Sequence, residues 1–410
     1  MSLAPEEREL AAALAERAPR MEADLERWVN LPTGWGHEPG LEAMRAELAE
    51  RLAGLGGRAE RWPGDPAPAV MAGAPGAPPA GSPPPTLVVH GPRPEGSRAA
   101  LIACHLDTVF SPDGPFLRLT RPAPGTVVGP GCADMKGGIA IAVAALEAIA
   151  ALRLPVAWSA VFNSDEETGS FHSASHLRRL APGFDVGLAT EPAMADGGLV
   201  VERMGSGQFR IDCRGRAAHA GRDFERGISA VTALAESLVS AAALAAPRDG
   251  RILNVGPIRG GDAANVVPAE ASAWGTIRFR DEAAGESLVA GLRALERGDD
   301  SNPPSVRTVS VLNRPAKPRT AEVSRMAECC REVSEALGHA LPFGATGGTS
   351  DGNILQSAGL PVLDSLGVRG GNLHRHDEFV DLASIPWRAA LLAITLLRLT
   401  RPSAVRSRSG

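Results

Sequence analysis

Five short segments between His105 and Glu378 hold the residues whose types could do chemistry. They are His105-Leu106-Asp107, Asp134 within residues 132–138, the run Asp165-Glu166-Glu167, Glu191-Pro192, and His374 with Glu378. Two histidines and three carboxylates from separate segments are the ligands that a pair of zinc-like ions needs. One further carboxylate beside a ligand can serve as the base for a water that the ions activate. These residue types predict a metal-dependent hydrolase.

Three of these segments follow apolar stretches that predict β-strands. His105 follows 100–104, Glu166 and Glu167 follow 156–162, and Glu191 follows 186–189, while 135–152 and 173–180 predict helices between them. Strands that alternate with helices predict a largely parallel sheet with helices on both faces. Active sites in such sheets form beyond the carboxyl ends of the strands. We therefore expect these side chains to meet at one rim.

Each motif taken alone has an ordinary explanation. His105 and Asp107 project to the same side of an extended chain, so Asp107 can hold the imidazole ring, but both also suit a strand-end turn. Asp134 can cap a helix, and the acidic run at 165–167 can be a solvated turn. The last histidine is open between His374 and His376, because spacing alone does not choose. The ordered combination of all the motifs favours a metal site.

The segment from 205 to 312 has a different pattern. Strands are expected at 208–213, 251–258, 271–279 and 305–311, with helices at 227–245 and 283–295. This pattern predicts an antiparallel α+β unit inserted into the α/β domain. Further helices are expected at 6–30, 41–55, 323–337, 352–357 and 385–397, and further strands at 86–90 and 361–366. The expected division is 1–204 and 315–400 for the catalytic domain, 205–314 for the insert, and 401–410 for a disordered tail.

Composition excludes several other classes of protein. With 44% hydrophobic and 22% charged residues and a net charge of −5, the chain is globular, and no nucleic-acid or membrane partner is expected. Five cysteines without a CxxC spacing argue against a disulfide framework, and Cys104 is expected to be a buried thiol pointing away from His105. Neither a signal peptide nor an apolar stretch of membrane-spanning length is visible, so the cytoplasm is the expected location.

Three motifs carry a family resemblance that runs from about residue 20 to 400. They are His-Leu-Asp-Thr-Val-Phe at 105–110, Gly-Pro-Gly-Cys-Ala-Asp-Met-Lys-Gly-Gly at 129–138 and Asp-Glu-Glu-Thr-Gly-Ser at 165–170. The chain resembles the aminoacylase and glutamate carboxypeptidase-like dinuclear zinc peptidases, which include acetylornithine deacetylase and succinyl-diaminopimelate desuccinylase. It looks most like the bacterial glutamate carboxypeptidase branch. The resemblance implies a peptidase-like catalytic domain with an inserted dimerisation domain.

The resemblance also implies roles for the residues of the rim. His105 and Glu191 would bind one ion, Glu167 and His374 the other, and Asp134 would bridge them. Glu166 would be the general base and Asp107 the orienting carboxylate. His374 is preferred over His376 because the family histidine commonly lies four residues before a glutamate, here Glu378, although some relatives have a spacing of five.

Two Zn²⁺ ions are the implied cofactor, and Co²⁺ or Mn²⁺ would also suit carboxylate and imidazole ligands. Two such ions, three carboxylate ligands and a bridging hydroxide sum to zero charge, which leaves Glu166 as an anion able to take a proton. The expected reaction is hydrolysis of an amide bond in an N-acyl amino acid or short peptide bearing a carboxylate, through a metal-bridging hydroxide. The alternatives are an N-acyl-amino-acid deacylase of the acetylornithine or desuccinylase type, a zinc aminopeptidase, and a non-catalytic relative that binds metal or peptide.

The inserted segment contains further residues that match the family pattern. His219 matches a histidine that reaches the active site of the neighbouring subunit, so a homodimer is expected. Asn265 and Arg278 match positions that hold the substrate carboxylate, although many relatives have Asp where Thr276 stands. Gly348 and Ser350 lie in a segment that resembles the glycine-rich substrate loop of the family.

Overall fold

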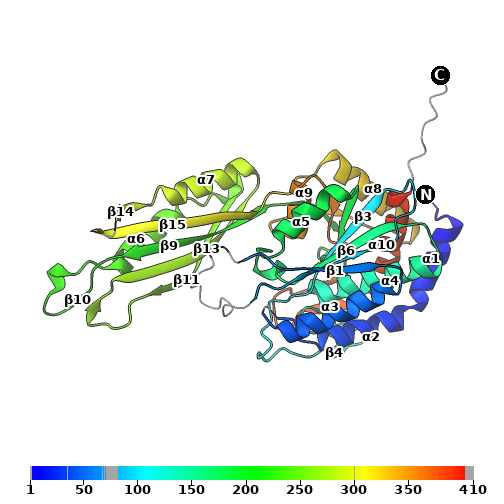
Figure 1. The fold of residues 1–410 in the computed structure, drawn as a ribbon, viewed down its shortest axis with the longest axis horizontal. Coiled ribbons are helices and arrows are strands. Elements are labelled where there is room, and N and C mark those ends of the chain that lie inside the picture. The colour runs from blue at the N-terminus through cyan, green and yellow to red at the C-terminus, as the bar shows by residue number, and fades with distance from the viewer. Residues whose placement is uncertain are drawn as a thin grey trace, which may run out of the picture.

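The protein consists of two bodies built around separate sheets, as Figure 1 shows. It is a computed structural model that describes residues 2–34, 36–66, 68, 70, 82–299 and 301–401. The expected tail lies outside the described residues except for Arg401. The first and last helices, α1 (Pro5–Glu16) and α10 (Ser384–Thr400), lie in the larger body, far from the tip of the narrower one.

The larger body is built on a six-stranded sheet in the order β1-β2-β6-β3-β7-β17. The strands are β1 (Arg58–Trp62), β2 (Thr86–His90), β3 (Ala99–His105), β6 (Ala157–Asn163), β7 (Val186–Ala189) and β17 (Val362–Leu363). Neighbours from β6 to β17 are parallel, whereas β2 runs antiparallel to both β1 and β6. The predicted fold class, a mainly parallel sheet flanked by helices, is confirmed.

Helices cover both faces of this sheet because its strands are apolar on both sides. Ala100, Ile102 and Cys104 of β3 pack into the core formed with helices α1, α2 (Ala18–Val29), α3 (Glu38–Ala53), α4 (Gly138–Ala151), α8 (Ala321–Ala336) and α10. Leu101 and Ala103 pack on the other face, with α5 (Ala174–Leu180) and α9 (Asp351–Ser357). Alternation therefore leaves His105 on the face opposite to the buried Cys104, as predicted.

Some predicted elements differ from the observed ones. The helix expected over 6–30 is two helices, because Pro19 in the first turn of α2 has no N–H with which to continue α1. Strands β2 and β3, adjacent in sequence, do not pair, since β6 lies between them. Two small sheets of the larger body were not predicted, and all but one of their strands have four residues or fewer. They pair β8 (Leu199–Arg203) with β16 (Phe343–Thr346), and join β4 (Thr120–Ala123), β5 (Thr126–Val128), β18 (Gly370–Gly371) and β19 (Phe379–Asp381).

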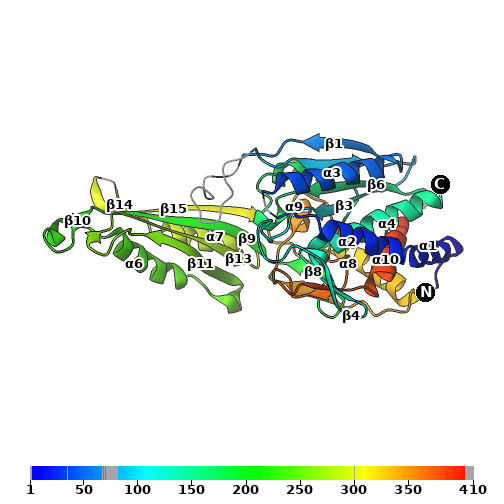
Figure 2. The ribbon, with the colours of Figure 1, turned by 90° about the horizontal axis from the view of Figure 1, so that it is seen from below.

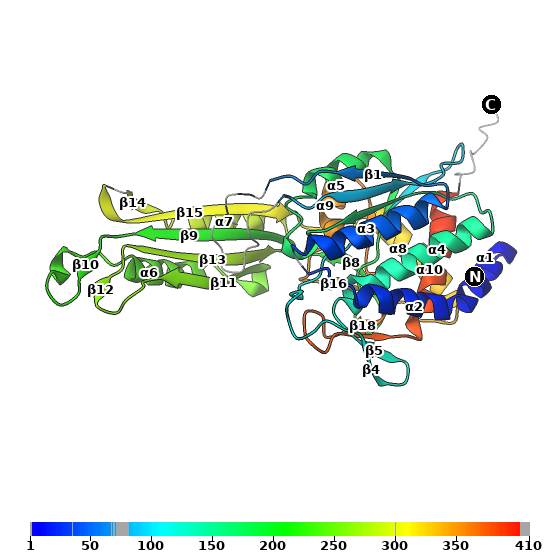
Figure 3. The same ribbon diagram turned by 60° about the horizontal axis from the view of Figure 1, so that its bottom comes forward.

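The narrower body is an antiparallel sheet in the order β11-β13-β9-β15-β14. Its strands are β9 (Gly205–Arg214), β11 (Arg251–Gly260), β13 (Glu270–Phe279), β14 (Arg297–Asp299) and β15 (Asn302–Arg314). Helices α6 (Ala230–Ala242) and α7 (Glu282–Arg293) bury one face of the sheet in a core of its own. The short strands β10 (Ala218–His219) and β12 (Val266–Val267) lie at the tip away from the larger body (Figures 2 and 3). The domain boundaries at 204 and 314 stay a prediction.

Close packing at the start of α4 fixes the rim of the sheet. A Cβ atom on Gly138 would lie 2.0 Å from the carbonyl oxygen of Thr190, next to Glu191. We expect Gly138→Ala to lower the free energy of unfolding by about 1–3 kcal/mol, because the backbone after β7 must move. Urea denaturation measures this change. Gly183→Ala is the matched control, because its Cβ would meet nothing within 4 Å. This substitution should change the free energy of unfolding by less than about 0.5 kcal/mol. Equal effects of the two substitutions would contradict the packing argument.

Candidate active site

His105 is the last residue of β3 and lies in a fully enclosed position, 1% exposed. Its Nδ1 is 3.0 Å from the backbone oxygen of Asp107, so a proton on Nδ1 donates to that oxygen. The opposite nitrogen, Nε2, faces two carboxylates at 3.2 Å from Asp134 Oδ1 and 3.8 Å from Glu191 Oε2. This orientation leaves Nε2 available as a metal ligand.

Asp134 lies in an irregular helical turn, Cys132–Gly137, that precedes α4. Gly131, at φ +67°, begins this turn, and Asp134 itself departs from helical geometry at φ −112° and ψ 89°. Its two carboxylate oxygens point to different histidines, because Oδ1 faces His105 while Oδ2 is 3.4 Å from Nε2 of His374. A carboxylate in this orientation can bridge two ions.

His374 completes a second group of donors on the other side of Asp134. Its Nε2 is 3.2 Å from Glu167 Oε2 as well as 3.4 Å from Asp134. The His374 backbone has φ +64°, a conformation that is uncommon for residues with a side chain and often marks functional sites. The side chain of His374 is 53% exposed, whereas that of His105 is 1% exposed. The half of the site around His374 therefore opens to solvent.

The spacing of these donor atoms fits two metal ions. Ligand atoms bound at about 2.0–2.2 Å to one tetrahedral zinc ion lie roughly 3.3 Å apart. The observed separations around His105 are 3.2 and 3.8 Å, and those around His374 are 3.2 and 3.4 Å. One atom each from His105, Asp134 and Glu167 also lies within 4.8 Å of the others, so the two halves are contiguous. Nitrogen and oxygen donors of this kind suit zinc, cobalt or manganese.

The electrostatics of the site also favour cations. Burial and the nearby Asp134 raise the pKa of Glu167 to about 8, although His374 opposes this shift. Burial likewise raises the pKa of Glu191. Burial acts to raise the pKa of Asp134 as well, but hydrogen bonds with His105 and His374 outweigh it and lower that pKa. The same bonds to Asp134 and Glu167 raise the pKa of His374 to about 11. The donor groups thus form a concentrated negative region that attracts positive charge.

Asp107 has a different set of contacts from the one expected. Its carboxylate accepts hydrogen bonds from the backbone N–H groups of Glu166, at 3.1 Å, and Glu167, at 2.9 Å. His105 is instead bonded by the Asp107 backbone oxygen, and the closest carboxylate oxygen of Asp107 is 3.5 Å from Nδ1. The Asp107 side chain therefore fixes the backbone of the acidic run more directly than it fixes the imidazole ring.

Glu166 lies beside the ligand cluster, and its closest ionic partner is a residue that the sequence analysis missed. Arg314 Nη2 is 2.7 Å from Glu166 Oε1 and also donates to the Glu166 backbone oxygen at 2.6 Å. The same nitrogen donates to Ser170 at 2.7 Å. Burial raises the pKa of Glu166 to about 7 against the lowering effect of Arg314. Arg314 ends β15, so it ties the narrower body to the rim.

The structure separates the other expected residues into two places. His219 and Asn265 lie together at the tip of the narrower body, where the Asn265 oxygen accepts a hydrogen bond from Ala220, and both are exposed. They are not brought to the ligand cluster of their own chain (Figure 1). Arg278, on β13, donates to Thr276 at 2.5 Å and interacts electrostatically with Arg314 and Glu166, so it lies near the rim.

Gly348 and Ser350 have structural contacts of their own. The Gly348 oxygen accepts a hydrogen bond from Arg203 at 3.3 Å. The Ser350 hydroxyl caps α9 and donates to Asp364 at 2.7 Å, so its side chain is buried and already bonded. His376 stacks on Phe116, with ring centroids 5.5 Å apart, whereas His374 faces the carboxylates. The geometry therefore favours His374 as the histidine donor.

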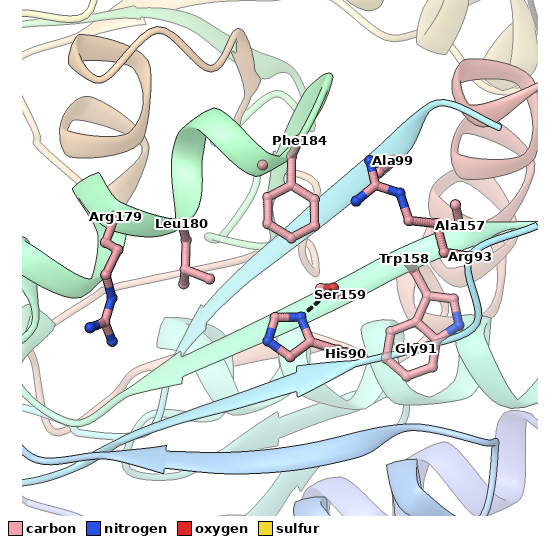
Figure 4. A pocket seen from close by; sticks show the side chains of 11 residues that line it. His90, Gly91, Arg93, Ala99, Ala157, Trp158, Ser159, Arg179, Leu180 and Phe184 are labelled. Carbon is pink, nitrogen blue, oxygen red and sulfur yellow. Dashed lines mark hydrogen bonds between the residues drawn. The ribbon is translucent and has the colours of Figure 1, made fainter. Parts of the chain in front are cut away.

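A cavity of about 350 Å³ lies at the end of the sheet away from the donor cluster. Figure 4 shows the side chains that line it. Its lining includes Ala99 and Ala157, the first residues of β3 and β6, whereas the donor cluster follows the last residues of these strands. His90 is bonded there to Ser159 at 3.2 Å, and the residues found to line the cavity in the described part of the chain include no carboxylate. The candidate active site is therefore the rim and not this cavity.

Comparison with known proteins identifies the family to which the chain belongs. The model of the peptidase family M20/M25/M40 matches residues 101–398. Carboxypeptidase G2 from Pseudomonas sp. (strain RS-16) is 26% identical over 95% of this chain and 92% of its own. Succinyl-diaminopimelate desuccinylase from Rhodospirillum rubrum is 30% identical over 69% of this chain and 78% of its own. The chain belongs to the peptidase family M20/M25/M40.

Solved structures show the same fold. The dipeptidase Dug1p from Saccharomyces cerevisiae has a TM-score of 0.75 at 16% identity, covering 96% of this chain and 98% of its own. The YXEP protein of Bacillus subtilis, described as a dinuclear metal-binding peptidase, has a TM-score of 0.64 at 12% identity, covering 95% of this chain and 100% of its own. The family match and the relatives found by sequence make the protein a metal-dependent metallopeptidase or amidohydrolase of the carboxypeptidase or desuccinylase type. No helix in the described residues combines the length and apolar character needed to cross a bilayer.

The pairing of Glu166 with Arg314 predicts a double-mutant result. Arg314→Met leaves a buried carboxylate without its cation, and we expect it to lower the free energy of unfolding by about 3–5 kcal/mol. Adding Glu166→Gln removes the unpaired charge, so the double variant should recover much of that loss. Urea denaturation of the four proteins measures the coupling. Strictly additive losses would show that the two side chains do not interact.

Proposed function

We propose that the protein hydrolyses an amide bond in an N-acyl amino acid or short peptide that carries a free carboxylate. The observation that carries this proposal is that the two oxygens of Asp134 face two different histidines, His105 and His374. Glu166 lies beside the two groups of donors, is a member of neither, and is paired with Arg314. Binding alone would not need a buried carboxylate beside a complete ligand set. This distinguishes a hydrolase from a relative that only binds metal or peptide.

The proposed cofactor is two Zn²⁺ ions, one held by His105 and Glu191 and the other by His374 and Glu167, with Asp134 between them. Two such ions supply Lewis-acid activation of water and of the scissile carbonyl group. Glu166 is the proposed general base, taking the proton of the attacking water and passing it to the leaving amine. Arg314 holds the Glu166 carboxylate in place, and Asp107 holds the backbone that carries Glu166 and Glu167.

A carboxylate-bearing substrate fits the cations on the narrower body. Arg278 and Arg314 lie close enough to influence each other, and burial lowers the pKa of Arg278, with Arg314 adding to that shift. An anion between such cations gains hydrogen bonds and relieves their repulsion. The carboxypeptidase and desuccinylase names of the relatives agree with substrates of this kind. A free amine, which an aminopeptidase would recognise, has no corresponding advantage here.

A homodimer through the narrower body is the proposed assembly. Strand β11 is an edge of its sheet, with β13 as its neighbouring strand among the described residues. Apolar side chains are exposed along this edge and on α6, including Ile258 at 57% and Val239 at 75%. Two copies that pair at β11 would cover both features in a symmetric interface. His219 and Asn265, which are remote from their own site, could then serve the site of the partner.

Glu166→Gln tests the proposed reaction. The variant keeps the size of the side chain but cannot take a proton, so kcat/KM should fall by about 10²–10⁴ while bound zinc stays unchanged. The assay uses N-benzoyl-, N-acetyl- and N-succinyl-amino acids together with peptides ending in glutamate. Metal content is measured by mass spectrometry on the same samples. Undiminished hydrolysis in a variant with full zinc content would contradict the role of Glu166.

Subunit complementation tests the proposed role of His219. Glu166→Gln and His219→Ala should each be inactive alone, but mixing and refolding them makes dimers with one intact site. Random reassortment gives about half of the dimers one subunit of each variant. Each of these mixed dimers has one intact site out of two, so the total activity should return to about a quarter of that of the wild type. Analytical ultracentrifugation checks that dimers form. Dimers without any recovered activity would contradict a role for His219 across the interface.

A further inference from the structure

Glu378 is a fully buried carboxylate beneath the donor cluster, and its spacing from His374 is the feature that favours that histidine over His376 in the sequence. Its side chain is 0% exposed, and it lies directly before β19, four residues after His374. One oxygen, Oε1, accepts hydrogen bonds from two consecutive backbone N–H groups, those of Ala133 at 2.8 Å and Asp134 at 3.0 Å. The other oxygen, Oε2, has no hydrogen-bond partner among the described residues.

The backbone of Glu378 contacts the same turn. Its carbonyl oxygen accepts a hydrogen bond from the N–H of Gly129 at 3.1 Å and from the thiol of Cys132 at 3.3 Å. Glu378 thus joins the segment of residues 129–134 to the loop that carries His374 by both its main chain and its side chain. Asp134 and His374 are themselves 3.4 Å apart at their donor atoms.

Burying a carboxylate costs free energy unless strong interactions compensate for it. Two N–H bonds to a charged oxygen provide part of this compensation, since charge-assisted bonds are about twice as strong as neutral ones. Lys136 lies close by, buried at 1% exposure with its Nζ bonded to the oxygen of Leu31, and burial lowers its pKa to about 7 although Glu378 opposes that shift. An apolar residue would fill this space at less cost, so a buried carboxylate bonded to the backbone of Ala133 and Asp134 points to a role beyond packing.

We propose that Glu378 is a positioning residue for the metal centre, and this rests on the dinuclear site of the proposed function. Its carboxylate fixes the backbone of Asp134, so that the two oxygens of Asp134 stay directed at different histidines. Because Glu378 and His374 share one loop, the same contact holds His374 at its distance from Asp134. The half of the site formed by His374 and Glu167 depends most on the contact between Glu378 and Asp134. This half is open to solvent, and His374 lies on the same loop as Glu378.

Zinc affinity measured by titration calorimetry and chelator competition tests the proposal. Carboxylates and carbonyls behind metal ligands typically contribute 10–100-fold in affinity, so Glu378→Ala should weaken the second of two bound ions by about that factor. Glu378→Gln keeps an oxygen acceptor and should lie between Glu378→Ala and wild type. With Co²⁺ in place of zinc, the visible absorption of the more weakly bound ion should change in both variants.

Glu7→Ala is the matched control. Glu7 is also a buried carboxylate, 2% exposed and paired with Arg398 at 2.8 Å, but it lies on α1. The Glu7→Ala substitution should lower the stability of the protein without changing its zinc affinity or the absorption spectrum of its cobalt form. Unchanged affinity for two ions in both Glu378 variants, with lowered stability alone, would overturn the positioning role. A wild-type protein that binds two ions tightly but hydrolyses no amide would instead contradict the proposed function and leave the role of Glu378 standing.

Discussion

The repulsion among four buried carboxylates at one rim is the constraint on which the structure depends most. Asp134, Glu166, Glu167 and Glu191 each lie within a few ångströms of another charged group of the cluster. Nothing in the apolar cores on either side of the sheet requires them to meet. These carboxylates are held in place by the carboxyl ends of parallel strands and by hydrogen bonds and an ion pair from neighbouring residues. Cations between them turn this repulsion into attraction, which is why the arrangement indicates a metal centre.

Different elements hold the individual side chains of the cluster in place. Strands β3, β6 and β7 deliver His105, the acidic run and Glu191 to one edge, since His105 is paired with Asn163 and Ala103 with Ala189 in register. Asp107 then fixes the acidic run and Glu378 fixes the turn of Asp134. Arg314 reaches the rim from the end of β15 and pairs with Glu166. Changes in the narrower body can therefore act on Glu166 through a direct contact.

Much of this site could be predicted from the sequence because its signals are local. His105 and Glu191 each follow an apolar strand, and the rule that parallel strands end at one edge was enough to bring them together. The family motifs then separated His374 from His376, which spacing could not do. The fold class followed from alternating strands and helices, whereas the short polar strands β4, β5 and β18 had no periodic apolar pattern to reveal them.

The residues behind the site could not be predicted in this way. Arg314 and Glu166 are 148 positions apart, and Glu378 and Asp134 are 244 apart. No spacing rule links residues so distant, because their contact exists only after the whole chain has folded. The bonds from the backbone N–H groups of Glu166 and Glu167 to the Asp107 carboxylate could not be expected either, since backbone N–H groups carry no signature in a sequence. These contacts are visible only in the folded structure.

The central claim is that Asp134 lies between two metal ions. The most direct measurement is X-ray anomalous scattering from crystals of the zinc-loaded protein, recorded on both sides of the zinc absorption edge. The account predicts two peaks about 3.5–4 Å apart, one beside His105 and Glu191 and the other beside His374 and Glu167. A single peak, or peaks away from Asp134, would contradict it.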